Sequence, residues 1–448
     1  MKGKKICIFT TFYDFDPGYS LCNCVEDQIR MLVDNGYETK VIVDQSFKSP
    51  GGYWDKVSYG YTPPVQRSNE GQLNDNWKNE VEAMYSSLKT ELEGYEVVLT
   101  HDVILQPAHL VHNVACRRLA NETNIRWLHW LHSPTQPQLE CNIAEVSDII
   151  RPKFPKSFIC YPNDWDRKRV ALNYGFELDE VKCVHHPSDF ISLLCGDEED
   201  FSEKGLFAWR LTRDFVKEFD LLSADVISVY PCRLDRGKQP EFNIKTMAKI
   251  KQLGRTVRLV IFDFHSTGGD KVIYRDELKQ IARKWGLTEK ECIFISEWRP
   301  ETLYNVPRQF IMNLKKMSDF AMHPSNTETY SLVCQESMAT KNFCVLNFQL
   351  PVMRDVYGSK NCLFEPFGST VDIQTGENGG TTLTIHDEDL HFTNLANKVL
   401  YFVENNPVIN QWRFIRQKRN LDYVFRNELE PLFYYEDLGR PVFGTKPI

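Results

Sequence analysis

The sequence predicts an α/β protein made of two facing doubly wound (Rossmann-like) domains, followed by a C-terminal helical tail. Three observations carry this prediction. Short apolar, β-branched runs alternate with helix candidates from residue 5 to about residue 190, which is the pattern of a parallel sheet. A second series of the same kind begins at residue 226. A chain of 448 residues is long enough for two or three domains.

The first series defines an N-terminal domain, to which we assign residues 1–190. Apolar runs predict strands at 5–11, 38–43, 97–100, 125–131 and 157–161. The segments between them predict helices at 24–35, 77–92, 105–121 and 164–173. Gly36 is a suitable stop for the first helix. The polar stretch 51–76 contains Gly, Pro and Asn and is expected to form loops.

The second series defines a C-terminal domain over residues 223–390, after a linker or insert over 191–222. The acidic run 197–204 in this linker is interpreted as solvated charge. Strands are predicted at 226–230, 258–262, 292–295, 320–322 and 343–347. Helices are predicted at 240–252, 276–285, 309–316 and 331–340. Residues 391–448 are assigned to a helical segment that crosses back to the first domain.

Composition narrows the class of protein. The net charge is −8 and the pI about 5.8, so a dedicated nucleic-acid binder is disfavoured, although a local basic groove is compatible with it. The 13 cysteines are scattered without a disulfide framework, which indicates reduced thiols in a cytoplasmic protein. No stretch approaches 18 apolar residues, so no transmembrane segment is expected. Peripheral contact with a membrane stays open.

The segment HPSNTETYSLVCQESMA at 323–339 is the most informative part of the chain. It follows a buried strand and holds Glu328 before a helix and Glu336 inside it. The rise of a helix limits their separation to about 12 Å. The free N–H groups of a helix start attract phosphate, so two carboxylates beside them suit the hydroxyls on either side of a diphosphate. Ordinary surface carboxylates are the alternative on spacing alone.

Two cations in YPCRLDRGKQPE form the second candidate. Arg233 and Lys238 follow a predicted strand and precede a helix. Arg offers a planar fork to phosphate oxygens and Lys a point charge, so the pair could neutralise a leaving diphosphate. A solvated loop is the alternative, and Arg236 between them shows how ordinary such charges are.

His132, in WLHWLHSP, is the candidate from the first domain. It follows a predicted strand and would face the cleft, where it could donate a hydrogen bond to a sugar or phosphate. A packed or capping histidine is the alternative. His129 is expected to be structural, His101 is a weaker candidate, and His185 and His186 are expected to form a turn.

Other chemistries lack a signature in the sequence. The triplets at 14–16 and 387–389 match an Asp-any-Asp pattern for divalent metals, but such triplets are frequent by chance, and we assign no metal site. Phosphate-binding glycine loops that end in Lys-Ser/Thr, dinucleotide-binding glycine motifs and serine-hydrolase elbows are absent. ATPase, dehydrogenase and hydrolase functions are therefore disfavoured.

Together these residues resemble the family-4-like retaining glycosyltransferases with the GT-B fold. PSNTETYSLVCQESMAT is similar to that family's carboxylate motif, with Glu328 and Glu336 at its two glutamate positions. CRLDRGK is similar to its diphosphate motif, with Arg233 and Lys238 in place about 95 residues upstream. The end of the first domain is similar as well, with Asp189 at the usual acidic position.

The resemblance implies a donor and a mechanism. Glu336 would bind the ribose of a nucleoside diphosphate sugar, most simply a UDP-sugar, and Glu328 would contact the sugar near its reacting carbon. His132 would touch the sugar from the first domain. The departing diphosphate would be stabilised by Arg233, Lys238, Thr329, Tyr330, Ser331 and Leu332. The acceptor would attack from the face that the diphosphate leaves, so the anomeric configuration would be retained. No metal or other cofactor would be required, because protein cations would neutralise the diphosphate.

The loop after the first strand departs from the family pattern. The family carries a Gly-Gly pair there, and this chain has Pro17-Gly18-Tyr19-Ser20. Gly18 is the residue of this loop that we assign to donor binding. Tyr19 would restrict the approach of the backbone to the donor phosphate or reshape the acceptor pocket.

The acceptor leaves alternatives open. A saccharide, a lipid-linked sugar or a protein would each supply a hydroxyl. A second hypothesis keeps the chemistry but makes the acceptor a hydroxymethylated base in DNA, as in phage enzymes of similar fold, with a basic patch at Lys153, Lys156, Arg167, Lys168 and Arg169. A third is a non-catalytic nucleotide-sugar-binding protein, against which the intact set of candidate residues argues.

Overall fold

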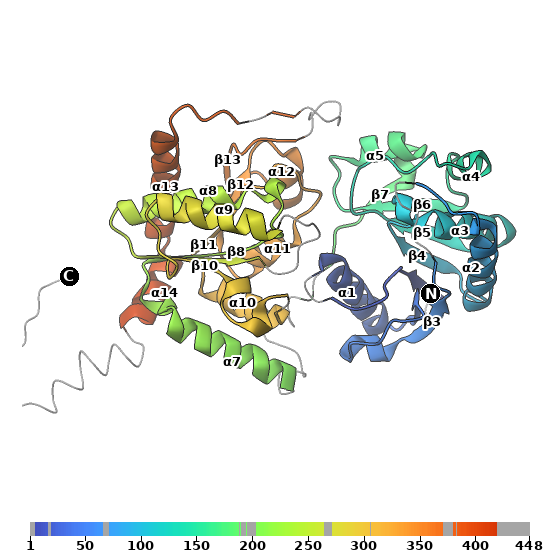
Figure 1. The fold of residues 1–448 in the computed structure, drawn as a ribbon, viewed down its shortest axis with the longest axis horizontal. Coiled ribbons are helices and arrows are strands. Elements are labelled where there is room, and N and C mark those ends of the chain that lie inside the picture. Colours follow the sequence, from blue (N-terminus) through green and yellow to red (C-terminus); the bar gives the residue numbers. More distant parts are fainter. Residues whose placement is uncertain are drawn as a thin grey trace, which may run out of the picture.

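The computed structural model describes residues 5–16, 19–65, 71–187, 189, 194, 203–263, 271–304, 306–370, 380–381 and 383–418. Two parallel sheets, one of seven and one of six strands, build two bodies that lie side by side (Figure 1). Helices flank both sheets. The predicted class of two doubly wound α/β domains with C-terminal helices is therefore confirmed.

The first sheet has the strand order β3-β2-β1-β4-β5-β6-β7. Its strands are β1 (Lys5–Phe9), β2 (Glu38–Asp44), β3 (Ser58–Thr62), β4 (Val97–His101), β5 (Arg126–Trp130), β6 (Ser157–Tyr161) and β7 (Val181–Cys183). Its helices are α1 (Ser20–Asp34), α2 (Trp77–Glu91), α3 (Leu110–Glu122), α4 (Ala144–Ile150) and α5 (Arg167–Tyr174). One core cluster packs α2 and α3 on one face, and another packs α1 on the other face. The strands are nearly continuous apolar runs because both faces are covered.

Strand β3 corrects one expectation, because it lies within the stretch 51–76 that was predicted to form loops. It pairs with β2 alone and so forms one edge of the sheet. Gly60 in its centre made the segment resemble a loop. A Cβ atom there would lie 2.6 Å from the Glu91 carboxylate and 3.0 Å from the Ile42 side chain, so a larger residue would displace these neighbours.

The second sheet has the strand order β10-β9-β8-β11-β12-β13. Its strands are β8 (Val226–Pro231), β9 (Val257–Phe262), β10 (Cys292–Phe294), β11 (Phe320–His323), β12 (Phe343–Asn347) and β13 (Leu363–Glu365). Its helices are α7 (Glu203–Glu218), α8 (Pro240–Gln252), α9 (Lys271–Lys284), α10 (Arg308–Met317), α11 (Leu332–Ala339), α12 (Pro351–Tyr357), α13 (Glu388–Asn405) and α14 (Pro407–Lys418). One face carries α8, α9 and α13, and the other carries α7 and α10.

The range 191–222, assigned to a linker, contains helix α7, which packs Leu211 and Phe215 into the second core. The acidic run at its start lies largely outside the described residues. Of the C-terminal segment 391–448, α13 and α14 are described up to Lys418, and the remainder lies outside the described residues. Among the described helices, none is long and apolar enough to cross a membrane.

Strand order fixes where a ligand can bind. In each sheet the chain order reverses at a central strand, since β1 lies between β2 and β4, and β8 lies between β9 and β11. In open parallel sheets, the loops after the strands diverge at such a point and leave a crevice at the carboxyl ends. The candidate residues follow β5, β8 and β11, at these edges of the two sheets.

Candidate active site

Lys238 and Glu328 meet in front of the second sheet. The Lys238 Nζ atom lies 2.5 Å from Glu328 Oε1, and the two side chains are 21% and 13% exposed. They come from the loops after β8 and β11, which are neighbouring strands, so the topology brings together residues 90 positions apart in the sequence. The structure thus joins one member of each predicted motif in a single ion pair.

Arg233 lies in the same loop as Lys238 but makes a different contact. Its guanidinium lies 3.4 Å from the Asp235 carboxylate, and its side chain is 55% exposed. It is therefore a more accessible cation than Lys238. Gly18, which was predicted to bind the donor from the loop after β1, lies outside the described residues.

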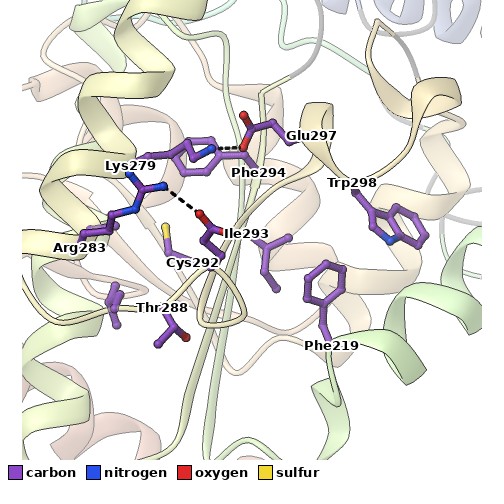
Figure 2. Close-up of a pocket in the computed structure, with 12 residues that line it drawn as sticks. Phe219, Lys279, Arg283, Thr288, Cys292, Ile293, Phe294, Glu297 and Trp298 are labelled. Carbon is purple, nitrogen blue, oxygen red and sulfur yellow. Dashed lines mark hydrogen bonds and ion pairs between the residues drawn. The ribbon is translucent and has the colours of Figure 1, made fainter.

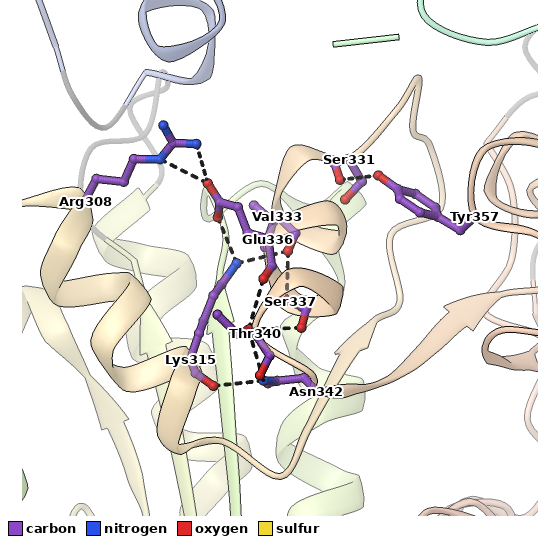
Figure 3. A network of polar contacts seen from close by, with 9 residues as sticks. All are labelled: Arg308, Lys315, Ser331, Val333, Glu336, Ser337, Thr340, Asn342 and Tyr357. Atoms are coloured by element: carbon purple, nitrogen blue, oxygen red, sulfur yellow. Dashed lines mark hydrogen bonds and ion pairs between the residues drawn. The ribbon is translucent and has the colours of Figure 1, made fainter. Parts of the chain in front are cut away.

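Glu336 is held by two cations that the sequence analysis did not single out. Lys315 Nζ and Arg308 Nη2 each lie 2.9 Å from one of its carboxylate oxygens, and the Lys315 side chain is fully buried. Figure 3 shows both pointing toward Glu336 from the neighbouring helix α10. Burial alone would raise the pKa of Glu336, but the two cations outweigh burial and lower the pKa to about 2. Glu336 is therefore a fixed anion.

The turn from Thr329 to Leu332 leads into helix α11. Ser331 has φ +68°, the left-handed region that costs an L-residue free energy. The Tyr357 hydroxyl holds this turn, since it lies 2.7 Å from the carbonyl oxygens of both Tyr330 and Ser331. Within the described residues, no acceptor binds the N–H groups of Ser331, Leu332 and Val333. The helix start therefore offers donors to an anion, beside the Lys238–Glu328 pair.

His132 is connected to the turn at Tyr330 by the ring of His186, which packs between them. Its ring stacks on His186, with centroids 5.0 Å apart, and the His186 ring meets Tyr330 edge-on at 5.0 Å. The expectation of a turn at 185–186 is not met, because His186 is buried and packed between the domains. His129 is buried, and it pairs with Thr100 at 2.8 Å as a structural residue would.

Direct contacts join the two domains around the site. Asn163 donates to the Thr329 carbonyl at 2.8 Å. Asp355 accepts from the backbone N–H groups of Asp164 and Trp165 at 2.9 and 3.2 Å. Each contact links the end of the first sheet to the turn or helix that follows β11 or β12. The candidate residues from both domains are thus held at one interface.

Two other features are less suited to the predicted chemistry. A cavity of about 190 Å³ lies beside the edge strand β10 (Figure 2), and its cations Lys279 and Arg283 pair with Glu297 and Glu289. None of the candidate residues lines this cavity.

His323, Cys334 and Cys344 place one potential metal-ligand atom each within 4.8 Å of one another, but all three are buried in the core. Asp387, from one Asp-any-Asp triplet, caps helix α13 instead.

The basic residues proposed for a DNA acceptor are largely engaged within the protein. Lys153 lies 2.5 Å from Glu180, and Arg167 and Arg169 pair with acidic residues three positions earlier at 2.8 and 2.6 Å. Lys156 donates to the carbonyl oxygen of Thr123. The carboxylates offset much of the positive charge that would attract a phosphate backbone.

Comparisons with known proteins agree with this geometry at the level of the fold. No model of a protein family matches the sequence, and no curated protein does. Among solved structures, Anabaena HepE in complex with UDP superposes with a TM-score of 0.57 at 14% identity, over 96% of this chain and 99% of HepE. The trehalose-6-phosphate synthase OtsA gives a TM-score of 0.60 at 12% identity, over 96% and 97%.

A third match has the same extent. Sucrose-phosphate synthase from Thermosynechococcus elongatus gives a TM-score of 0.55 at 12% identity, over 93% of this chain and 94% of the synthase. Matches that span both domains confirm, for the fold, the resemblance that the motifs indicated. The chain therefore has the GT-B fold.

Proposed function

We propose that the chain is a retaining glycosyltransferase that moves a sugar from a nucleoside diphosphate sugar to a hydroxyl acceptor. The observation that carries the proposal is the Lys238–Glu328 pair at 2.5 Å, placed beside the helix start of α11. A UDP-sugar is the favoured donor, because HepE is described in complex with UDP and glucose. A cation, a carboxylate and free N–H groups at one edge suit a sugar joined to a diphosphate.

The nucleotide end of the donor would lie against Glu336. Each carboxylate oxygen can accept two hydrogen bonds. Arg308 Nε and Nη2 both donate to Oε1 and Lys315 donates to Oε2, so one acceptor position on Oε2 is left for a ribose hydroxyl. Because Glu336 stays ionised, it accepts and never donates at neutral pH. The cations also keep the carboxylate in one orientation, which reduces the entropy lost when the donor binds.

The diphosphate would bind at the start of α11. The N–H groups of residues 329–332, Lys238 and Arg233 supply positive charge there from two adjacent loops. Charge develops on the diphosphate as its bond to the sugar breaks, so fixed donors and cations stabilise the transition state more than the ground state. Protein cations in this place make a divalent metal unnecessary.

The sugar would lie between Glu328 and His132. The carboxylate of Glu328 would stabilise positive charge that develops at the anomeric carbon. The bond between that carbon and the diphosphate oxygen breaks with its electron pair remaining on the diphosphate. The acceptor oxygen bonds to the carbon from the same face and gives its proton to the diphosphate oxygen, so the configuration is retained. Contact between the domains excludes water that would otherwise hydrolyse the donor.

The acceptor class is a saccharide, a lipid-linked sugar or a protein, each of which presents a hydroxyl group. A DNA acceptor is not proposed, since three of its five expected basic residues, Lys153, Arg167 and Arg169, are paired with carboxylates. A non-catalytic binding protein would need the same donor contacts without turnover.

Turnover of a panel of nucleotide-sugars tests the proposal. The protein is incubated with UDP-, GDP- and ADP-sugars, and release of the nucleoside diphosphate is measured together with the shift in Tm. A stabilising UDP-sugar that is also slowly hydrolysed supports a transferase. Stabilisation without any release of diphosphate, with or without saccharide acceptors, would indicate the binding protein instead.

A further inference from the structure

Three histidines and a glutamine form a hydrogen-bonded chain behind the sugar side of the site. His101 Nδ1 lies 3.0 Å from His132 Nε2, and His101 Nε2 lies 2.9 Å from Gln28 Oε1. His186 stacks on the other side of His132. The rings of His101 and His186 are buried, and burial lowers the pKa of both well below the usual histidine value. Both rings are therefore neutral, and each carries a single N–H proton.

The direction of the chain is set at Trp130. An indole N–H can only donate, and Trp130 Nε1 lies 3.1 Å from His186 Nδ1. That nitrogen must be an acceptor, so the proton of His186 is on Nε2. Cys24 Sγ lies 3.3 Å from the same nitrogen. Burial raises the pKa of Cys24, so its side chain stays a neutral thiol.

The cysteine then orients Gln28. The Cys24 sulfur has lone pairs that accept a weak hydrogen bond from the Gln28 amide nitrogen, which lies 4.0 Å away. The amide oxygen of Gln28 consequently faces His101 Nε2, and that nitrogen must donate to it. A neutral imidazole has one donor and one acceptor, so His101 Nδ1 accepts from His132 Nε2.

The chain ends on an unprotonated nitrogen. Burial lowers the pKa of His132 as well, and the carboxylate of Asp102 opposes this shift. The proton of neutral His132 is on Nε2, which leaves a lone pair on Nδ1. Among the described residues, none forms a hydrogen bond with His132 Nδ1. Asp102 Oδ1 accepts from the His132 backbone N–H at 3.0 Å and fixes the position of the residue.

We propose that Gln28 and His101 are positioning residues that hold His132 in its Nε2–H form, so that Nδ1 accepts a hydrogen bond from a hydroxyl of the transferred sugar. This rests on the proposed function, which places the sugar at His132. It replaces the expectation that His132 donates. A lone pair attracts a hydroxyl and repels a carboxylate, so this position favours a sugar that carries a hydroxyl there over one that carries a carboxylate.

The proton on His132 can be located without any substrate. In protein labelled with ¹⁵N-histidine, two-bond ¹H–¹⁵N correlation spectra distinguish the protonated from the unprotonated ring nitrogen, and the His132→Asn variant identifies the signal. The proposal expects a protonated Nε2 in the wild type. A proton on Nδ1 would overturn it, whatever the protein catalyses.

Variants of Gln28 test the chain in the same spectra. Gln28→Glu keeps an acceptor for His101 and should leave the Nε2–H form in place. Gln28→Met removes the acceptor and should give a mixture of the two forms. The matched control is Gln45→Met, an exposed glutamine in the same domain, which should leave the spectrum unchanged. An unchanged spectrum in Gln28→Met would show that Gln28 does not position His132.

Kinetics connect the chain to the sugar. With the best donor of the panel, Gln28→Met is expected to lower kcat/KM about fivefold to tenfold, the effect of one neutral hydrogen bond. A donor that lacks the contacted hydroxyl should lose less than about twofold, since it has no bond to lose. Equal losses with both donors would contradict the positioning role. A wild type that is inactive with every donor would refute the proposed function, while the spectra would still decide the form of His132.

Discussion

Arg308 and Asp27 connect the two domains behind the nucleotide side of the site. The Arg308 guanidinium lies 3.9 Å from the Asp27 carboxylate of α1, and it also pairs with Glu336 of α11 at 2.9 Å. Helix α1 belongs to the first domain and α10 to the second (Figure 1). One side chain therefore contacts both the proposed ribose-binding carboxylate and the opposite domain. Arg308 therefore links the proposed nucleotide side of the site to the first domain.

The pKa of Asp27 makes this contact pH-dependent. Burial raises the pKa to about 6, and Arg308 only partly opposes burial. A carboxyl whose pKa is higher in the folded than in the unfolded state stabilises the fold at low pH, and this contribution is lost as the pH rises through 6. Relative to wild type, Asp27→Asn should gain about 2 kcal/mol of unfolding free energy between about pH 4 and pH 6.5. Urea unfolding of the variant and the wild type at several pH values measures this difference in unfolding free energy. A difference that does not change with pH would contradict the raised pKa of Asp27.

Lys315 should be far more important for stability than its neighbour. Lys315→Met leaves Glu336 buried with Arg308 as its remaining ion pair, and removal of one partner of a buried pair costs about 3 kcal/mol. Lys316→Met, in the same helix, changes a side chain at the surface and should cost less than about 0.5 kcal/mol. The urea midpoints of both variants test this. Similar midpoints would mean that Lys315 does not hold Glu336.

Ser331 should be replaceable by glycine with a gain in stability. Its φ of +68° is unfavourable for a residue with a Cβ atom. Ser331→Gly should therefore add about 0.5 kcal/mol, after the greater entropy of glycine in the unfolded chain is subtracted. Ser331→Ala keeps the Cβ atom and serves as the control for the lost hydroxyl, with no gain expected. If the Tm of Ser331→Gly is equal to or below that of Ser331→Ala, the backbone of this turn is not strained.

Removal of divalent metal should leave turnover intact. The proposed diphosphate site takes its positive charge from Lys238, Arg233 and the start of α11. Turnover of the best nucleotide-sugar is measured in excess EDTA and after addition of Mg²⁺ or Mn²⁺. Rates within about twofold of each other are expected when the protein alone neutralises the leaving group. Strict dependence on added metal would mean that these cations are insufficient.

The sequence predicted the class of fold because its two alternating series are long and regular. It also predicted Lys238 and Glu328 as members of one site, because both follow strands whose carboxyl ends meet at one edge. Edge strand β3 was missed because Gly60 has a low strand propensity. In the folded protein, the pairing with β2 stabilises this strand. Local patterns cannot reveal such a tertiary contribution.

Arg308 and Lys315 could not be identified from their own segment. RQFIMNLKKM has the composition of an ordinary amphipathic surface helix, and a lysine in it is expected in solvent. Its burial depends on how α10 packs against α11, which joins residues 21 positions apart. One signal was available, because positions 308 and 315 are two helical turns apart and share a face. The chain of histidines was equally hidden, since it combines His101, His132 and His186 from three separate strand ends.

The measurement that tests the central claim most directly is the turnover of the best nucleotide-sugar by Lys238→Ala and Glu328→Ala. Each should lose about 100-fold or more in kcat/KM, the usual effect of removing one charge stabiliser at a reacting centre, while the fold is retained. Arg236→Ala is the matched control, since this cation lies in the same loop with its side chain 71% exposed and paired to Glu277. It should retain activity within about twofold. Wild-type turnover by either Lys238→Ala or Glu328→Ala would contradict the assignment of the site.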